Sequence, residues 1–181
     1  FIIDGCRWEI WEVIKVIFER RGYHIENDKQ SCLSAIPSIT SVSRTSLVTG
    51  KTLRMLVDEK MEGEFSFNIL NEEKHIQQAY PKKNVVFKKG GLEDLKGLLT
   101  ESSDIYVFIY TEGDALFHAV ESLTIESIEP LMEDLVNGIV EKIQKHDDLL
   151  ILFGTDHGSV KAENKEKLTF EIPDNIKIEQ H

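Results

Sequence analysis

The stretch Ile105-Tyr-Val-Phe-Ile-Tyr110-Thr-Glu-Gly-Asp114-Ala-Leu-Phe-His118 joins an apolar run to two side chains that can bind a metal ion. A continuous apolar and aromatic run of this length is typical of a strand buried on both faces, as in a parallel sheet. Asp114 and His118 are four residues apart, so in a helix they lie on one face and can bind the same ion. The stretch therefore predicts a buried strand followed by a metal-binding helix.

Polar residues also follow three other strand-like runs. These strings read Phe1-Ile-Ile-Asp4-Gly5, Pro37-Ser-Ile-Thr40 and Gly154-Thr-Asp156-His157-Gly158. The carboxyl ends of parallel strands gather at one edge of a sheet, which is the usual place for an α/β active site. We therefore expect Asp4, Thr40, Asp156 and His157 to converge on a metal site with a hydroxyl nucleophile.

Strand-like and helix-like patterns alternate along the chain. Strands are predicted over residues 1–4, 33–36, 85–87, 105–110, 149–153 and 168–172. Helices are predicted over residues 8–21, 41–49, 72–80, 92–99 and 125–145, whereas residues 51–69 give no clear pattern. The alternation predicts a single α/β domain over residues 1–181, with three layers and a mostly parallel sheet that carries helices on both faces. Phe1 already lies in a predicted strand, so we expect the natural protein to extend upstream, and the chain could also be cut at its C-terminus.

Composition and length agree with a globular protein. A chain of 181 residues that is 41% hydrophobic can bury roughly 70% of its unfolded surface. Cys6 and Cys32 are too few for a disulfide framework, which favours a reduced, cytoplasmic setting. No apolar run reaches the roughly 20 residues that span a bilayer, so we expect a soluble protein with no membrane partner.

The net charge of −11 restricts the partners. Non-specific binding to nucleic acid depends on Lys and Arg that neutralise phosphates, so a protein that coats nucleic acid is excluded. An anionic substrate is still compatible with this charge, because bound divalent ions are often the largest local charges in a site.

Each candidate side chain also has a purely structural interpretation. Asp4 could cap the helix that begins near Trp8, and Thr40 could cap the helix that follows it. The pair Asp156-His157 could form a hydrated turn, and His118 could pack or face water. Arg44 lies one turn after Thr40 and could bind phosphate oxygens or pair with a surface carboxylate. Their common position at predicted strand ends favours a site.

The ordered motifs of this chain resemble those of the alkaline phosphatase superfamily. They are Asp4-Gly5, Pro37-x-x-Thr40, Thr49-Gly50, Asp114-x3-His118 and Asp156-His157-Gly158, and the spacing Pro-x-x-Thr-x9-Gly is close to that of nucleotide pyrophosphatases/phosphodiesterases. The local sequences resemble the PglZ domain more closely: Ile3-Asp-Gly-Cys-Arg-Trp8, Ile36-Pro-Ser-Ile-Thr-Ser-Val-Ser-Arg44 and Phe153-Gly-Thr-Asp-His-Gly158. The resemblance spans residues 1–158.

The resemblance implies an alkaline-phosphatase-like fold and a site with two divalent metal ions, usually zinc, although the ligand types also suit manganese. It implies that one ion is surrounded by Asp4, Thr40, Asp156 and His157. It implies that Asp114 and His118 hold the other ion with a further histidine from the C-terminal part, for which the one candidate is His181. Either His181 is that ligand, or the ligand is missing and the second ion is weakly held.

Two functional classes follow from the resemblance. The first is a phosphodiesterase or phosphatase that acts on a nucleotide or another phosphorylated small molecule, with Thr40 as the metal-activated nucleophile and Arg44 as a substrate-binding residue. The second is a non-catalytic metal-binding module, regulatory or scaffolding, within a larger bacterial or archaeal assembly such as a phage-defence or signalling system. The sequence does not separate monoester from diester substrates.

Overall fold

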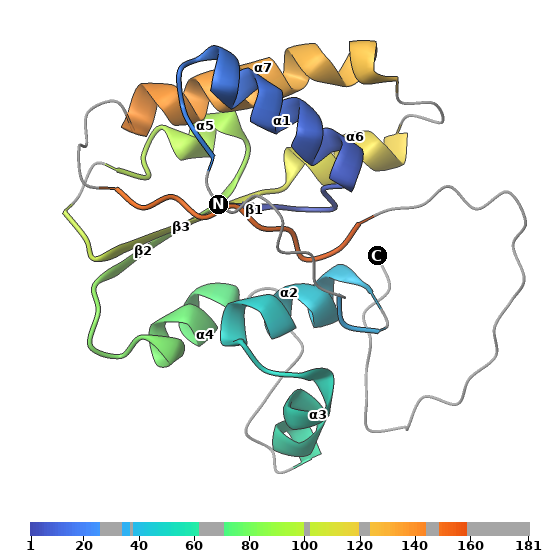
Figure 1. The fold of residues 1–181 in the computed structure, drawn as a ribbon. Coiled ribbons are helices and arrows are strands. Elements are labelled where there is room, and N and C mark those ends of the chain that lie inside the picture. The colour runs from blue at the N-terminus through green and yellow to red at the C-terminus, as the bar shows by residue number, and fades with distance from the viewer. Residues whose placement is uncertain are drawn as a thin grey trace, which may run out of the picture.

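The computed structural model describes residues 1–25, 34–36, 38–61, 71–99, 102–119, 124–143 and 149–158. In this part of the chain a parallel sheet is flanked by helices (Figure 1). The α/β class predicted from the sequence is therefore confirmed. The described part contains no helix that is long and apolar enough to cross a membrane.

The described sheet has the order β1-β3-β2, and both strand pairs are parallel. The strands are β1 (Ile2–Ile3), β2 (Val85–Gly90) and β3 (Ile105–Tyr110), so β3 has its predicted bounds and β2 extends beyond residues 85–87. In the register, Tyr110 lies level with both Ile3 and Gly90. The three strands thus end at the same height, and the residues after them meet at one edge.

The predicted strand over residues 149–153 is wrong as regular structure. This segment runs beside β1 and forms one isolated parallel bridge, between Ile2 and Gly154. Its backbone bonds to β1 are Gly154 N to Phe1 O and Ile3 N to Gly154 O, both 2.9 Å. A two-residue strand offers too few partners for a full ladder, which explains the difference. Even so, the bridge places residues 155–158 beside the carboxyl end of β1.

Helices occupy most of the predicted positions. They are α1 (Trp8–Arg20), α2 (Thr40–Thr49), α3 (Leu53–Met61), α4 (Glu72–Ala79), α5 (Leu92–Leu95), α6 (Glu112–Ala119) and α7 (Ile125–Ile143). The α3 helix lies where the sequence pattern is unclear, and α5 is shorter than the predicted 92–99 because residues 96–99 form turns. Residues 34–36 are not in a strand, which corrects the prediction for 33–36, and the predicted strand 168–172 lies outside the described residues.

The main core lies between the sheet and the pair α1 and α7. Apolar residues at helical spacing on α1, Ile10, Ile14 and Ile17, are at most 1% exposed. They join Phe108 of β3 and a matching row on α7 in one hydrophobic cluster. Figure 1 shows α1, α5 and α7 on one side of the sheet and α2, α3 and α4 on the other. With three described strands, the full three-layer arrangement stays a prediction.

Candidate metal centre

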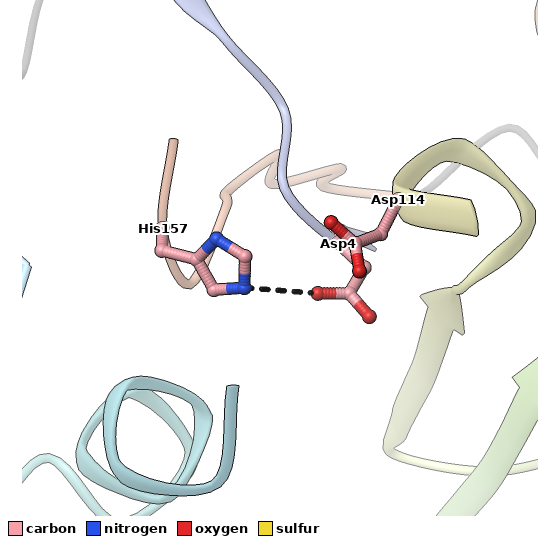
Figure 2. A group of neighbouring side chains, drawn as sticks. All are labelled: Asp4, Asp114 and His157. Carbon is pink, nitrogen blue, oxygen red and sulfur yellow. Dashed lines mark ion pairs between the residues drawn. The ribbon is translucent and has the colours of Figure 1, made fainter. Parts of the chain in front are cut away.

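The carboxyl edge of the sheet brings together side chains from three separate segments. Asp4 follows β1, Asp114 lies in α6 just after β3, and His157 follows the bridge at Gly154. One ligand atom from each of these residues lies within 4.8 Å of the others. Figure 2 shows the His157 ring and the Asp4 carboxylate facing each other, with Asp114 beside them. The sequence prediction that distant motifs converge here is therefore met for these three residues.

Gly5 allows Asp114 to approach β1. Its φ is +64°, a left-handed conformation that glycine adopts without steric cost. A Cβ atom at this position would lie 2.5 Å from Asp114 Oδ1. The glycine after Asp4 is therefore required twice, once by the backbone turn and once by the neighbouring carboxylate.

His157 is held in one tautomer by the backbone. Its Nδ1 lies 3.1 Å from the carbonyl oxygen of Gly158, and since a carbonyl only accepts, Nδ1 carries the proton of the neutral ring. The lone pair of the neutral ring is then on Nε2, which lies 3.5 Å from Asp4 Oδ1. A histidine whose Nδ1–H binds a carbonyl presents Nε2 in the way that metal-binding histidines commonly do.

Thr40 points into the same centre. Its Oγ1 lies 3.0 Å from His157 Nε2 and donates the hydroxyl proton to that nitrogen. The capping interpretation of Thr40 is wrong, because Thr40 is the first residue of α2 and the N-cap is Ile39. Asp4 is likewise not the cap of α1, whose N-cap is Arg7. Both residues are thus placed at the centre rather than used at a helix end.

Arg44 lies behind the centre. Its side chain is 1% exposed, and it forms ion pairs with Asp4 Oδ2, Asp156 Oδ2 and Glu72 Oε1. Burial alone lowers the pKa of Arg44, but the three carboxylates outweigh this effect and the pKa lies above its ordinary value. Its observed partners are therefore buried carboxylates of the protein, and its predicted role in substrate binding stays a prediction.

Asp156 has protein donors on both carboxylate oxygens. Oδ1 accepts from the backbone N–H groups of His157 at 3.0 Å and Gly5 at 3.4 Å, and Oδ2 accepts from Arg44 Nε at 3.0 Å. Burial raises the pKa of Asp156, and so does the neighbouring Asp4 carboxylate, while Arg44 and the Gly5 N–H favour its charged form. In the structure Asp156 therefore fixes the loop that carries His157, and its predicted role as a ligand stays a prediction.

Glu72 was missed by sequence reasoning. It is 2% exposed, and its two oxygens bind Arg44 Nη1 at 3.1 Å and Lys89 Nζ at 3.0 Å. The local sequence Asn71-Glu-Glu-Lys74 is typical of a solvated helix start, so it gave no signal of burial. The pairing with Arg44 joins positions 28 residues apart.

Two predicted ligands cannot be placed. His118 belongs to α6, but its side chain lies outside the described residues, as does the whole of His181. The second predicted ion therefore has one described ligand, Asp114.

The described residues fit a divalent cation. Asp4 Oδ1 is buried and has no hydrogen-bond partner among the described residues, which is costly unless a cation is bound to it. Arg44 and Lys89 pair with three carboxylates, those of Asp4, Asp156 and Glu72, so the two cations leave part of this negative charge uncompensated. A divalent ion held by Asp4, Asp114 and His157 would offset it.

Asp4, Asp114 and His157 lie at the carboxyl edge of a parallel sheet. The protein is therefore of the α/β class, with a candidate metal centre at the usual place for an active site in that class. A comparison with protein families matches residues 1–181, the whole chain, to the BREX system PglZ alkaline phosphatase-like domain. The chain belongs to this family. Searches among curated proteins and among solved structures gave no significant match. The resemblance read from the motifs is thus confirmed, and an alkaline phosphatase-like domain agrees with divalent metal use.

Proposed function

We propose that this chain is a metal-dependent phosphohydrolase, a phosphodiesterase or phosphatase, in which Thr40 is the nucleophile at a two-metal site. The observation that carries the proposal is the position of the Thr40 hydroxyl, which lies 3.0 Å from His157 Nε2. His157 in turn belongs to the group it forms with Asp4 and Asp114. The substrate class is a nucleotide or another phosphorylated small molecule. Membership of an alkaline phosphatase-like family supports a phosphoesterase-like chemistry.

The chain offers ligands for zinc, with manganese as the alternative. Asp4, Asp156, His157 and Thr40 would hold one ion, and Asp114, His118 and His181 the other. When bound, such ions lower the pKa of a coordinated hydroxyl and stabilise the negative charge that develops on phosphoryl oxygens. The protein's own contribution is to hold these ligands in a buried setting.

Thr40 and its helix supply the remaining chemistry. The Thr40 oxygen forms a bond to phosphorus while the leaving group departs, and water then cleaves the phosphothreonine. The Thr40 hydroxyl donates to His157 Nε2 in this structure. That lone pair would be used by a bound ion instead, and the hydroxyl proton would then pass to water. The first turn of α2 has no side-chain cap in the described part of the chain. Val42 and Ser43 already donate their N–H groups to Ile39 O, so a phosphate oxygen would be bound by the N–H groups before them. A contact of Arg44 with substrate would require its guanidinium to exchange a carboxylate for a phosphate oxygen.

One observation favours a second function, a non-catalytic metal-binding module. Arg44 already binds the Oδ2 atoms of both Asp4 and Asp156, so a fixed cation takes part of the negative charge that two metal ions would need. The family description includes a BREX system, which supports a place in a larger phage-defence assembly with protein partners. We place this module in the cytoplasm. The family description supports phage defence, whereas it does not mention a signalling role.

The deciding experiment compares Thr40→Ala and Thr40→Ser with Thr49→Ala as the matched control. Thr49 lies on the same helix, and its hydroxyl donates to Thr45 O, away from the centre. Protein purified without chelator is analysed for metal content and assayed with an aryl phosphodiester and an aryl phosphomonoester. We expect turnover per metal-loaded molecule to fall by orders of magnitude in Thr40→Ala, to persist in part in Thr40→Ser, and to be unchanged in Thr49→Ala. A metal-loaded wild type without turnover would support the module, and an unimpaired Thr40→Ala enzyme would exclude the nucleophile.

A further inference from the structure

Glu72, the first residue of α4, joins two cations beneath the metal centre. Its Oε1 accepts from Arg44 Nη1 at 3.1 Å, and its Oε2 accepts from Lys89 Nζ at 3.0 Å. Glu72 is 2% exposed, whereas Lys89 on β2 is about a third exposed and reaches toward solvent. A carboxylate this deeply buried is maintained by its partners, and the more buried partner is Arg44.

Arg44 passes this anchoring on to two aspartates. Each of its guanidinium nitrogens faces a different carboxylate: Nη1 binds Glu72, Nε donates to Asp156 Oδ2 at 3.0 Å, and Nη2 pairs with Asp4 Oδ2. The guanidinium is planar and rigid, so fixing Nη1 also fixes the directions of Nε and Nη2. The position of Glu72 therefore decides where the Oδ2 atoms of Asp4 and Asp156 are held.

The two oxygens of Asp4 consequently have separate roles. Oδ2 is engaged by Arg44, and Oδ1 faces His157 Nε2 at 3.5 Å without a hydrogen-bond partner among the described residues. If the anchor at Glu72 were lost, the charge of the guanidinium would be shared by two carboxylates instead of three. It would then compete more strongly with a bound cation for the charge of Asp4 and Asp156. We propose that Glu72 is a positioning residue for the metal centre, which acts through Arg44 to keep Asp4 Oδ1 available to the ion. This inference rests on the metal-binding part of the proposed function.

The test measures metal affinity rather than turnover. In Glu72→Gln the side chain keeps its size and loses its charge, and Glu73→Gln is the matched control, since Glu73 is the next residue of α4, exposed, and bonded to Gln77. Zinc affinity per folded molecule is determined by competition with a chromogenic chelator. Removing a direct partner of a metal ligand usually weakens binding about tenfold to a hundredfold. Glu72 acts one step further away, through Arg44, so we expect Glu72→Gln to bind zinc about tenfold more weakly, the low end of that range. Glu73→Gln should bind zinc as the wild type does.

Cobalt(II) gives a second readout. Its visible absorption reports the geometry of the ligands, so Glu72→Gln should alter the spectrum of the cobalt-loaded protein, and Glu73→Gln should leave it unchanged. A purely structural role for Glu72 predicts a lower melting temperature with the same zinc affinity and the same cobalt spectrum. That result overturns the inference.

Two further variants test the path through Arg44. Lys89→Gln should bind zinc normally, and an affinity loss equal to that of Glu72→Gln would show that Lys89 carries the effect. In an Arg44→Lys background the Glu72→Gln change should lose most of its effect, because a single ammonium cannot bind all three carboxylates. Fully additive effects overturn the inference. Should Glu72→Gln not fold, Glu72→Asp replaces it, and zinc affinity equal to wild type in that variant overturns the inference as well.

The possible failures are distinguishable. Wild-type protein that binds neither zinc, manganese nor cobalt overturns this inference together with the proposed metal site. Equal zinc binding by wild type and Glu72→Gln overturns the inference alone. Zinc-loaded protein that hydrolyses nothing contradicts the enzymatic proposal and leaves a measured difference between Glu72→Gln and Glu73→Gln as support for the positioning role.

Discussion

Replacing Arg44 by methionine should test how much the buried ion-pair network contributes to stability. The change keeps a long side chain and removes the one cation shared by Asp4, Asp156 and Glu72, whose side chains are 8%, 0% and 2% exposed. Removing one partner of a buried ion pair typically costs about 3–5 kcal/mol, because a buried charge is left without compensation.

Three carboxylates do not triple this cost. Glu72 keeps Lys89, and Asp156 keeps two backbone N–H donors, so Asp4 is the group that loses most. We therefore expect a loss of about 3–5 kcal/mol, which is a large fraction of the 5–15 kcal/mol by which domains are typically stable. For a chain of this size the melting temperature should fall by roughly 6–20 °C.

The assay is urea unfolding at pH 7.5 and at pH 5, with Arg20→Met as the matched control. Arg20 pairs with Glu129 at 2.6 Å, but both side chains are exposed, so its loss should cost less than about 1 kcal/mol. Arg44 favours the charged form of Asp156, so without Arg44 the pKa of Asp156 rises further above its ordinary value. A carboxyl whose pKa is raised on folding destabilises the folded state above its unfolded-state pKa, so this part of the penalty should shrink as the pH falls through the raised pKa. Equal losses in Arg44→Met and Arg20→Met would refute this reasoning.

Three other predictions concern the centre and its surroundings. Gly5→Ala should lose about 1–2 kcal/mol through its positive φ and should also weaken zinc binding by displacing Asp114, measured by titration. Gly50 also has a positive φ, +66°, but no described atom lies within 4 Å of an added Cβ, so Gly50→Ala should lose stability and keep its zinc affinity. Equal losses of zinc affinity in Gly5→Ala and Gly50→Ala would count against the contact between position 5 and Asp114. Zinc at a hundredfold excess over its dissociation constant should stabilise the fold by about 2.7 kcal/mol, and a melting curve that is indifferent to both zinc and chelator would exclude the site. Burial raises the pKa of Cys6 to about 12, so iodoacetamide at pH 8 should label Cys32→Ser protein slowly until it unfolds, and equal rates in folded and unfolded protein would contradict this.

The sequence predicted correctly those strands and helices whose form is set by their own residues. The run over 105–110 is continuously apolar, and it forms β3 with the predicted bounds. The run over 149–153 is just as apolar, but its regularity depends on a partner, and β1 offers two residues. The same limit explains the unclear pattern of residues 53–61, where α3 packs through Leu56 against Val42 of α2 rather than through a long amphipathic face.

Site residues could be predicted where a polar side chain directly follows an apolar run, which is an unusual place for it. They could not be predicted where burial depends on a partner far away in the sequence. Asp4 and His157 follow apolar runs, so their placement could be inferred, and the structure decides against the capping alternative for Asp4 and Thr40. Glu72 could not be found in this way, because a helical glutamate is normally solvated and its burial depends on Arg44.

The pairing of β1 with the segment before Asp156 has a consequence for folding during synthesis. The backbone of Gly5 binds an aspartate 151 positions later, so closing this loop costs about 4–5 kcal/mol of chain entropy plus a constant. A nascent chain on the ribosome cannot recover this cost until the segment up to His157 has emerged. One edge of β1 can pair with β3 earlier in synthesis. The other edge has to wait for one of the last described segments, and through that interval this edge and Asp4 are exposed to chaperones and to other chains.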